Sequence, residues 1–343
     1  MNEIYSRGRR DLVIGVDAGG TRTRAYLAPL VAAGWDGGEG DGTALGRGAG
    51  GPGNALSVRR PELTRHLTDA IAAAVPAADR HRVAAVFGGF AGSAVGVGPE
   101  RGRGLALSCL EDALAANGIT AAAVDVGGDT EVALAAAPGA PADGLVLIAG
   151  TGAIATRLTD RRRAAVVDGH GWLLGDEGSG FWLGGHAVRA ALEALDGRGP
   201  WTSLVAEVAA HHLPRGSYEP VGAVRPLAGP EERHRLAEAV VTSAYARPPA
   251  RLAELSLAAV RAAAEGDAVA LRLLDSAADL LVASVRALEP RAGEPLVLTG
   301  GLLGPGGPLL ERVTARLDGL DLRIFPVADG GAGAAALARL LPR

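Results

Sequence analysis

The sequence predicts an α/β protein built of two lobes, and three observations lead to that prediction. The chain has 343 residues, and at ~150 residues per domain this length suggests about two domains. Short apolar runs that are typical of strands alternate along the chain with stretches of helical spacing. A unit of strand, glycine turn and second strand occurs once in each half, at residues 12–30 and again at 144–158. This repetition indicates that the two lobes arose by duplication.

The first third of the chain is predicted to form a sheet with a covering helix. Residues 12–16 and about 24–30 have the composition of two strands joined by a tight turn. Residues 36–54 are rich in glycine and are predicted to be a loop that ends in GGPGN. The segment ELTRHLTDAIAAAV, residues 62–75, has helical spacing, and RVAAVFGGFAG, residues 82–92, is typical of a buried strand that enters a glycine loop.

The middle of the chain continues this alternation. LSCLEDALAANG, residues 107–118, predicts a helix, and Gly118 is a suitable residue to end it. AAAVDVGGD, residues 121–129, predicts a strand that ends at Asp129, and the spacing over residues 130–137 predicts the helix that follows.

The second half begins like the first, with a strand, a glycine turn and a strand over residues 144–158. Residues 186–290 are mostly helical in pattern. EPLVLTGGLLG, residues 294–304, predicts a buried strand that runs into glycines, and GGAGAAALARLL, residues 330–341, predicts a closing helix.

Composition and charge exclude several classes of function. The formal net charge is −4 and aromatic residues make up 3% of the chain, so we expect no nucleic-acid partner and no membrane partner. The single cysteine, Cys109, excludes an internal disulfide framework and a cysteine-cluster zinc site. The single cysteine is typical of a reducing compartment. The sequence also has no apolar signal core and only short apolar runs, so we expect a cytoplasmic protein. The absence of lysine excludes a GxxxxGK[ST] P-loop.

The first glycine turn, within DLVIGVDAGGTRTRAYL at residues 11–27, has the chemistry of a phosphate site. Glycines let backbone N–H groups approach an anion, and neighbouring hydroxyls add donors. A carboxylate beside phosphate makes sense when a divalent cation lies between them. The predicted Mg²⁺–phosphate hairpin consists of Asp17, Gly19, Gly20, Thr21 and Thr23. Arg22 and Arg24 are expected to face solvent or the opposite side.

Two further glycine turns extend this pattern. The turn AGTGA, residues 149–153, is a candidate to hold the same phosphates from the other lobe, and TGGLLG, residues 299–304, is a candidate for the nucleoside end. The candidate residues are Gly150, Thr151, Gly152, Gly300 and Gly301. Each turn alone is equally well explained as an ordinary hairpin. Three of them in this order, with an aspartate at the first, are much less expected by chance.

These motifs resemble those of a known superfamily. IGVDAGGTRTR, VLIAGTGAIA and VLTGGLLG resemble the two phosphate motifs and the adenosine motif of the sugar kinase/actin-like ATPase superfamily. GHGWLLGDEGSGFWLGGHAV, residues 169–188, resembles the motif of N-acetylglucosamine kinases within the BadF/BadG/BcrA/BcrD-type ATPase family, and GGPGN resembles that family's substrate loop. The resemblance covers residues 12–339. It implies a two-lobed actin-like ATPase (ribonuclease H-like) fold with a duplicated mixed β-sheet core, ATP and Mg²⁺ in the interlobe cleft, and a homodimer.

The expected lobes follow from the motifs. Residues 1–123 would form the N-terminal lobe, with the first phosphate hairpin and the sugar loop. Residues 124–332 would form the C-terminal lobe, and the closing helix at about 333–343 would join the first lobe.

Phosphoryl transfer to a hydroxyl needs a carboxylate that orients and deprotonates it. Asp125, Asp129, Asp176 and Glu177 are the candidates. Asp129 ends a strand, where open α/β sheets place their ligands, and the resemblance implies that it is the catalytic base. Its alternative role is a helix cap.

The resemblance also implies the residues that bind the sugar. Asp176 and Glu177 in GDEGSG would contact sugar hydroxyls, with Glu177 alternatively fixing the loop. The other expected contacts are Asn54, Asp129, Gly171 and Trp172. Phe181 and Trp182 are expected to pack in the core.

The predicted function is therefore an ATP-dependent kinase that phosphorylates the 6-hydroxyl of N-acetylglucosamine. Three alternatives stay open: a kinase for glucosamine or another amino sugar or sugar-like metabolite, an ATPase that couples hydrolysis to a partner, and a regulator without catalysis. The single cysteine disfavours an activator that shares an iron–sulfur cluster between subunits. Asp129 disfavours the regulator.

Overall fold

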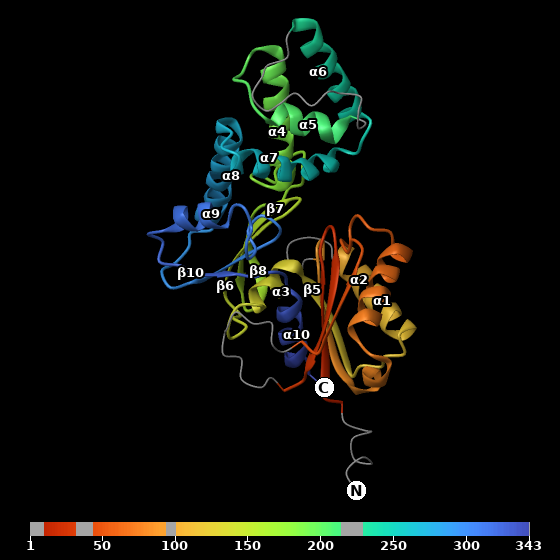
Figure 1. Ribbon diagram of the computed structural model, residues 1–343. Helices are drawn as coiled ribbons and strands as arrows, with labels where there is room; N and C mark the ends of the chain where they lie inside the picture. The colour runs from red at the N-terminus through yellow and green to blue at the C-terminus, as the bar shows by residue number, and fades with distance from the viewer. Residues whose placement is uncertain (1–9, 32–43, 94–100, 214–228, 343) are drawn as a thin grey trace.

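The computed structural model describes residues 10–31, 44–93, 101–213 and 229–342. The described residues form two five-stranded mixed sheets (Figure 1). The first sheet contains β1 (Leu12–Ala18), β2 (Thr23–Pro29), β3 (Gly46–Gly50), β4 (Val83–Phe90) and β5 (Ala123–Gly128). The second contains β6 (Gly144–Ala149), β7 (Ala153–Thr159), β8 (Arg162–Asp168), β9 (Pro295–Thr299) and β10 (Arg323–Pro326).

The two sheets have the same topology. The first has the order β3-β2-β1-β4-β5 and the second, read in the same direction, β8-β7-β6-β9-β10. In the first sheet β3, β2 and β1 pair antiparallel, and β4 and β5 run parallel to β1. In the second sheet β8, β7 and β6 pair antiparallel, and β9 and β10 run parallel to β6. This confirms the predicted α/β fold with two lobes and a duplicated mixed sheet core.

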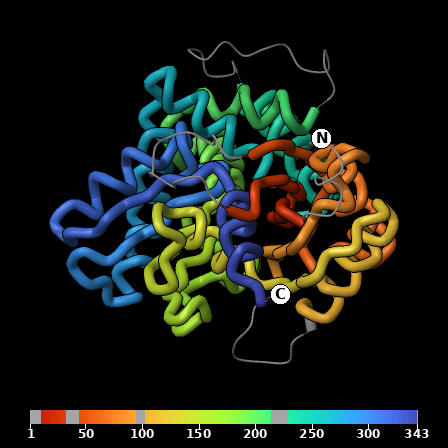
Figure 2. Tube along the Cα trace, turned by 90° about the horizontal axis from the view of Figure 1, so that it is seen from below, coloured from red at the N-terminus to blue at the C-terminus, as the bar shows by residue number. Residues whose placement is uncertain are grey.

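The first sheet is covered on both faces, which explains why β1 is apolar along its whole length. Leu12, Ile14 and Val16 belong to a core shared with α1 (Arg60–Ala74) and α2 (Arg101–Ala116). Val13 faces the other way and packs with Ala335 of α10 (Gly331–Leu340). The closing helix α10 therefore lies on the first sheet and crosses α3 (Asp129–Ala135) where the two lobes meet (Figures 1 and 2).

The strand β3 is a correction to the predicted loop over residues 36–54. Within the described part of that segment, residues 46–50 pair with β2 as an edge strand. Gly48 shows why: a Cβ there would lie 1.9 Å from the carbonyl oxygen of Ala70, so only glycine lets the backbone of α1 pack directly on this strand. The glycines that indicated a loop are needed for helix packing.

The strand β5 requires a second correction, to the lobe boundary expected between residues 123 and 124. All of β5 pairs with β4 in the first sheet, from Ala123 to Gly128. The boundary therefore lies after Gly128, because a cut within a hydrogen-bonded strand would divide the sheet.

The second lobe carries the long helical segment. Its helices are α4 (Gly180–Asp196), α5 (Leu204–His212), α6 (Pro230–Tyr245), α7 (Ser256–Ala264), α8 (Ala268–Arg286) and α9 (Leu310–Leu317). Short 3₁₀ segments, η1 (Ala77–Arg82) and η2 (Pro249–Leu255), complete the two lobes. The helices share one apolar core with the second sheet. Among the described residues, no helix is both long and apolar enough to cross a membrane.

Candidate active site

Asp17 lies near the end of β1, beside the start of α10. Its Oδ2 accepts a hydrogen bond of 3.0 Å from the backbone N–H of Gly330. Burial raises the pKa of Asp17 to about 7, with a further contribution from the negative charge of Asp329 and a smaller one from Asp129. A half-buried carboxylate among other carboxylates is a site that a cation would stabilise.

Asp329 is a site residue that sequence reasoning missed. Its Oδ2 accepts a hydrogen bond of 2.7 Å from the Tyr26 hydroxyl and lies 3.4 Å from Nε of Arg24. Arg24 therefore faces this cluster, contrary to the expectation that it would point away. The aspartate followed by glycines at a helix start, ADGGAG, was the sequence signal available.

The first glycine turn is compact and partly exposed. The N–H of Gly19 donates to the carbonyl of Arg22 over 2.9 Å, and Gly20 and Thr21 are exposed at the tip. Thr23 is different, because its side chain is fully buried and its hydroxyl has no hydrogen-bond partner among the described residues. The observed conformation covers this hydroxyl, and the role of Thr23 as a phosphate donor stays a prediction.

Asp129 is the first residue of α3, at the carboxyl end of β5. Its Oδ1 accepts from the N–H of Thr130 over 2.9 Å and lies 3.2 Å from Nη2 of Arg163 on β8. Burial raises the pKa of Asp129, and the positive charge of Arg163 opposes that rise. The residue at the N-cap position is Gly128, and the Glu131 side chain accepts its N–H. The carboxylate of Asp129 thus remains directed to the junction of the lobes.

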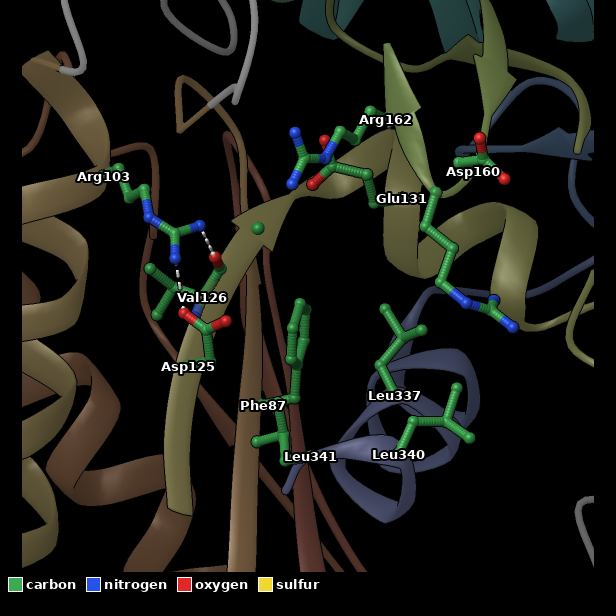
Figure 3. Close-up of a pocket in the computed structure, with 12 residues that line it drawn as sticks. Phe87, Arg103, Asp125, Val126, Glu131, Asp160, Arg162, Leu337, Leu340 and Leu341 are labelled. Carbon is green, nitrogen blue, oxygen red and sulfur yellow. Dashed lines mark hydrogen bonds and ion pairs between the residues drawn. The ribbon is translucent and has the colours of Figure 1, made fainter. Parts of the chain in front are cut away.

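Asp125, the other candidate on this strand, has a different environment. It lies 2.6 Å from Arg103 of α2, which also donates to the carbonyl of Val126. Both line a cavity of about 650 Å³. Figure 3 shows this pair on one side of the cavity and Leu337 and Leu340 of α10 on the other. Asp125 therefore has a structural partner and lies apart from Asp17 and Asp129.

The second and third glycine turns lie against each other. A Cβ on Gly150 would be 4.0 Å from the N of Gly301, and the N–H of Leu302 donates to the carbonyl of Ala149 over 3.0 Å. Gly300 has a φ of +95° that a side chain would strain. Thr151 is exposed at the tip of its turn, and Gly152 is half-buried beside it.

The GDEGSG segment folds over the second glycine turn. Oδ1 of Asp176 accepts from the N–H of Ala153 over 3.2 Å, and burial raises the pKa of Asp176. Asp168, which sequence reasoning missed, accepts from the backbone N–H groups of Asp176 and Glu177 over 2.8 and 2.7 Å. Asp168 therefore fixes the loop. Glu177 is exposed.

Trp172 and Gly171 lie in the same loop. The Trp172 ring is 45% exposed and its centroid lies 5.6 Å from that of Phe181. This exposed side chain is accessible to a ligand. Trp182 instead stacks on His186 at 3.8 Å, away from such a role.

Asn54 belongs to the first lobe's loop GGPGN. Its side-chain oxygen accepts from the N–H of Leu56 over 2.8 Å, which fixes the carboxamide. The N–H of Gly53 donates to the carbonyl of Gly19 over 2.8 Å, so the predicted sugar loop and the first phosphate turn are joined.

The structure thus gathers the predicted residues into two groups. Asp17 and Asp129 lie together at the junction of the lobes, with the turn at Gly19 and the loop of Asn54 beside Asp17. The second glycine turn, the third glycine turn and Asp176 form the other group. Among the described residues, no hydrogen bond or ion pair joins Asp129 to Asp176.

A divalent cation fits the first group. Asp17 and Asp329 supply hard oxygen atoms, and the pKa of Asp17 is raised first by burial and then by the negative charge of Asp329. The described residues contain no set of three or more acidic, histidine or cysteine side chains arranged to hold a metal alone.

The sequence of this chain is similar to that of a curated protein. The N-acetylmuramic acid/N-acetylglucosamine kinase of Clostridium acetobutylicum is 30% identical over 198 residues, which cover 57% of this chain and 58% of that protein. The chain thus aligns with a little more than half the length of this curated relative.

Two solved structures have the same fold. A protein of Chromobacterium violaceum, provisionally named an N-acetylglucosamine kinase, superposes with a TM-score of 0.66 at 26% identity, over 96% of this chain and 99% of that one. Another provisional N-acetylglucosamine kinase, from Porphyromonas gingivalis, gives a TM-score of 0.63 at 20% identity over 96% and 99%, which shows the fold alone.

The family of this chain is shown by a match along most of its length. Residues 14–317 match the BadF/BadG/BcrA/BcrD ATPase family, and this range includes both sheets except for β10 and the first residues of β1. The chain therefore belongs to the BadF/BadG/BcrA/BcrD ATPase family.

Proposed function

We propose that this protein is an ATP-dependent carbohydrate kinase that transfers the γ-phosphoryl group of ATP to the 6-hydroxyl of N-acetylglucosamine. The observation that carries the proposal is the position of Asp129, a half-buried carboxylate at a strand end, close to the carboxylate of Asp17. Family membership and the names of the two relatives above 25% identity support a sugar kinase.

Asp129 would act as the general base. Oδ1 is engaged by Thr130 and Arg163, which leaves Oδ2 to accept the proton of the sugar hydroxyl. The oxygen of that hydroxyl forms the new bond to the γ-phosphorus, the bond from that phosphorus to the β-phosphate oxygen breaks, and ADP leaves.

The glycine turns would hold the nucleotide. The turn of Gly19, Gly20 and Thr21, whose last two residues are exposed, would face the phosphates from the first lobe, and the turn at 150–152, with Thr151 exposed, would face them from the second. Gly300 and Gly301 would lie at the nucleoside end. Asp17, with Asp329 behind it, would hold Mg²⁺. When bound, Mg²⁺ neutralises charge that develops on the phosphates.

The sugar would lie between Asn54 of the first lobe and the GDEGSG loop of the second. Asp176 and Glu177 would accept from its hydroxyls, and Gly171 and Trp172 would form the wall of the pocket. Polar contacts of this kind discriminate strongly against analogues that lack a hydroxyl. Lobe closure would bring these groups to Asp129 and exclude water, which competes as an acceptor.

The first test is ADP release from ATP and Mg²⁺ with a panel of sugars. N-acetylglucosamine, glucosamine, N-acetylmannosamine, glucose and N-acetylmuramic acid would be compared with a control without sugar. We expect release that depends on N-acetylglucosamine. Equal release without sugar would instead indicate an ATPase that couples hydrolysis to a partner protein. Release only with N-acetylmuramic acid would identify that sugar as the substrate.

The second test is Asp129→Asn. We expect this variant to bind sugar and ATP normally and to lose turnover by about 10²- to 10⁴-fold, the usual contribution of a general base. Near-normal turnover would remove Asp129 from the mechanism. A homodimer is also proposed, and light scattering of the purified protein would test it.

A further inference from the structure

Arg163 connects the two sheets at the candidate catalytic residue. It lies on β8 of the second sheet, and its Nη2 is 3.2 Å from Oδ1 of Asp129 at the start of α3. Its Nε donates to the hydroxyl of Thr130 over 3.1 Å. The side chain is only 15% exposed. A guanidinium with two fixed contacts on one helix start is held in a defined orientation.

The backbone leaves room for this arginine. A Cβ on Gly128 would lie 3.0 Å from Nη2 of Arg163, so the glycine before Asp129 lets the guanidinium approach closely. The preceding residue, Arg162, lines the cavity in Figure 3. Arg163 is not among the residues that line this cavity.

The charges around Asp129 explain what the ion pair does. The negative charge of Asp129 raises the pKa of Asp17 on β1 and of Glu131 on its own helix, so Asp129 lies among other carboxylates. Arg163 forms the ion pair with Asp129, and its positive charge also lowers the pKa of Glu131. The positive charge of Arg103 also lowers the pKa of Glu131, but Arg103 itself forms an ion pair with Asp125. Arg163 is therefore the cation in contact with the candidate base.

We propose that Arg163 is a positioning residue for phosphoryl transfer, which holds Oδ1 of Asp129 through its ion pair so that Oδ2 faces the acceptor hydroxyl. The proposal rests on the proposed function. Arg163 keeps its own protons throughout, since the proton of the hydroxyl passes to Asp129. Its contribution is orientation and charge, as expected for a charged hydrogen bond to a catalytic base.

The kinetic test compares Arg163→Gln, Arg163→Lys and the control Arg162→Gln across about pH 5.5 to 9. For Arg163→Gln we expect kcat at neutral pH to fall by about tenfold or more, KM for ATP to change by less than about threefold, and the acid limb of the profile to move up by about one pH unit. Arg163→Lys restores the charge and should return the acid limb to its wild-type position. Arg162→Gln should match the wild type.

Two outcomes would overturn the proposal. One is a wild-type profile in Arg163→Gln. The other is a loss that is the same at every pH and is not relieved by lysine, which would indicate a structural role alone.

A second measurement does not depend on turnover. Thermal unfolding of the wild type, Arg163→Gln, Asp129→Asn and the double variant is compared over the same pH range. If Arg163 compensates the charge of Asp129, Arg163→Gln loses stability as pH rises, and adding Asp129→Asn removes that loss. Independent effects of the two changes would refute the ion pair. If the pair is present but no sugar supports turnover, the proposed function fails and the charge compensation stands.

Discussion

Asp17 gives the most quantitative prediction, because ionising its carboxylate costs free energy in the folded protein without ligand. Burial and the charge of Asp329 raise its pKa from 3.8 to about 7. The folded state thus holds the proton more tightly than the unfolded state. The stability from this group is fully present below about pH 4 and is lost as pH rises through about 7.

The change Asp17→Asn removes this titration and keeps an oxygen that accepts the N–H of Gly330. A rise of about three pKa units, at ~1.4 kcal/mol each, corresponds to about 4 kcal/mol. Partial exposure of the side chain and a compact unfolded chain reduce the effect. We therefore expect the variant to be more stable than the wild type by about 2–4 kcal/mol at pH 8 and nearly equal to it at about pH 4.

The assay is unfolding by denaturant or heat in the presence of a chelator, over about pH 4 to 9. Asp160→Asn, at an exposed position of the β7–β8 turn, is the matched control and should follow the wild type. Parallel curves for the wild type and Asp17→Asn would refute the argument, because they would mean that Asp17 does not titrate in this range. The same variant should lose the stabilisation that ATP with Mg²⁺ gives to the wild type.

Two further predictions concern packing and the sugar loop. Gly48→Ala places a methyl group 1.9 Å from the carbonyl oxygen of Ala70 and should destabilise the protein by about 1–3 kcal/mol or more. Gly104→Ala, where a Cβ meets nothing within 4 Å in helix α2, should stabilise it by up to ~1 kcal/mol. Equal effects in unfolding experiments would contradict the packing of α1 on β3. Asp168→Asn loses its charge and one acceptor for the GDEGSG loop, so KM for the sugar should rise about tenfold while KM for ATP is unchanged. A rise in both constants would assign Asp168 to general stability.

Several features of this protein follow from local sequence alone. The strands β1 and β9, the helices α1 and α10 and the glycine turns were predicted because each depends on spacing within ten or twenty residues. The repeated unit predicted the duplicated sheet. The strand that ends at Asp129 also predicted where that carboxylate would lie, since strand ends meet at one edge of a sheet.

Only the tertiary structure decided the environment of each charge. Arg163 reaches Asp129 across 34 residues, and Gly330 reaches Asp17 across 313. No local pattern indicates partners at such separations. The strand β3 likewise exists because the backbone of α1 packs on its glycines, and Thr23 is buried because the loop at Gly53 covers it. Local patterns placed the reactive groups along the chain, and packing between distant segments decided which of them are ionised, accessible and paired.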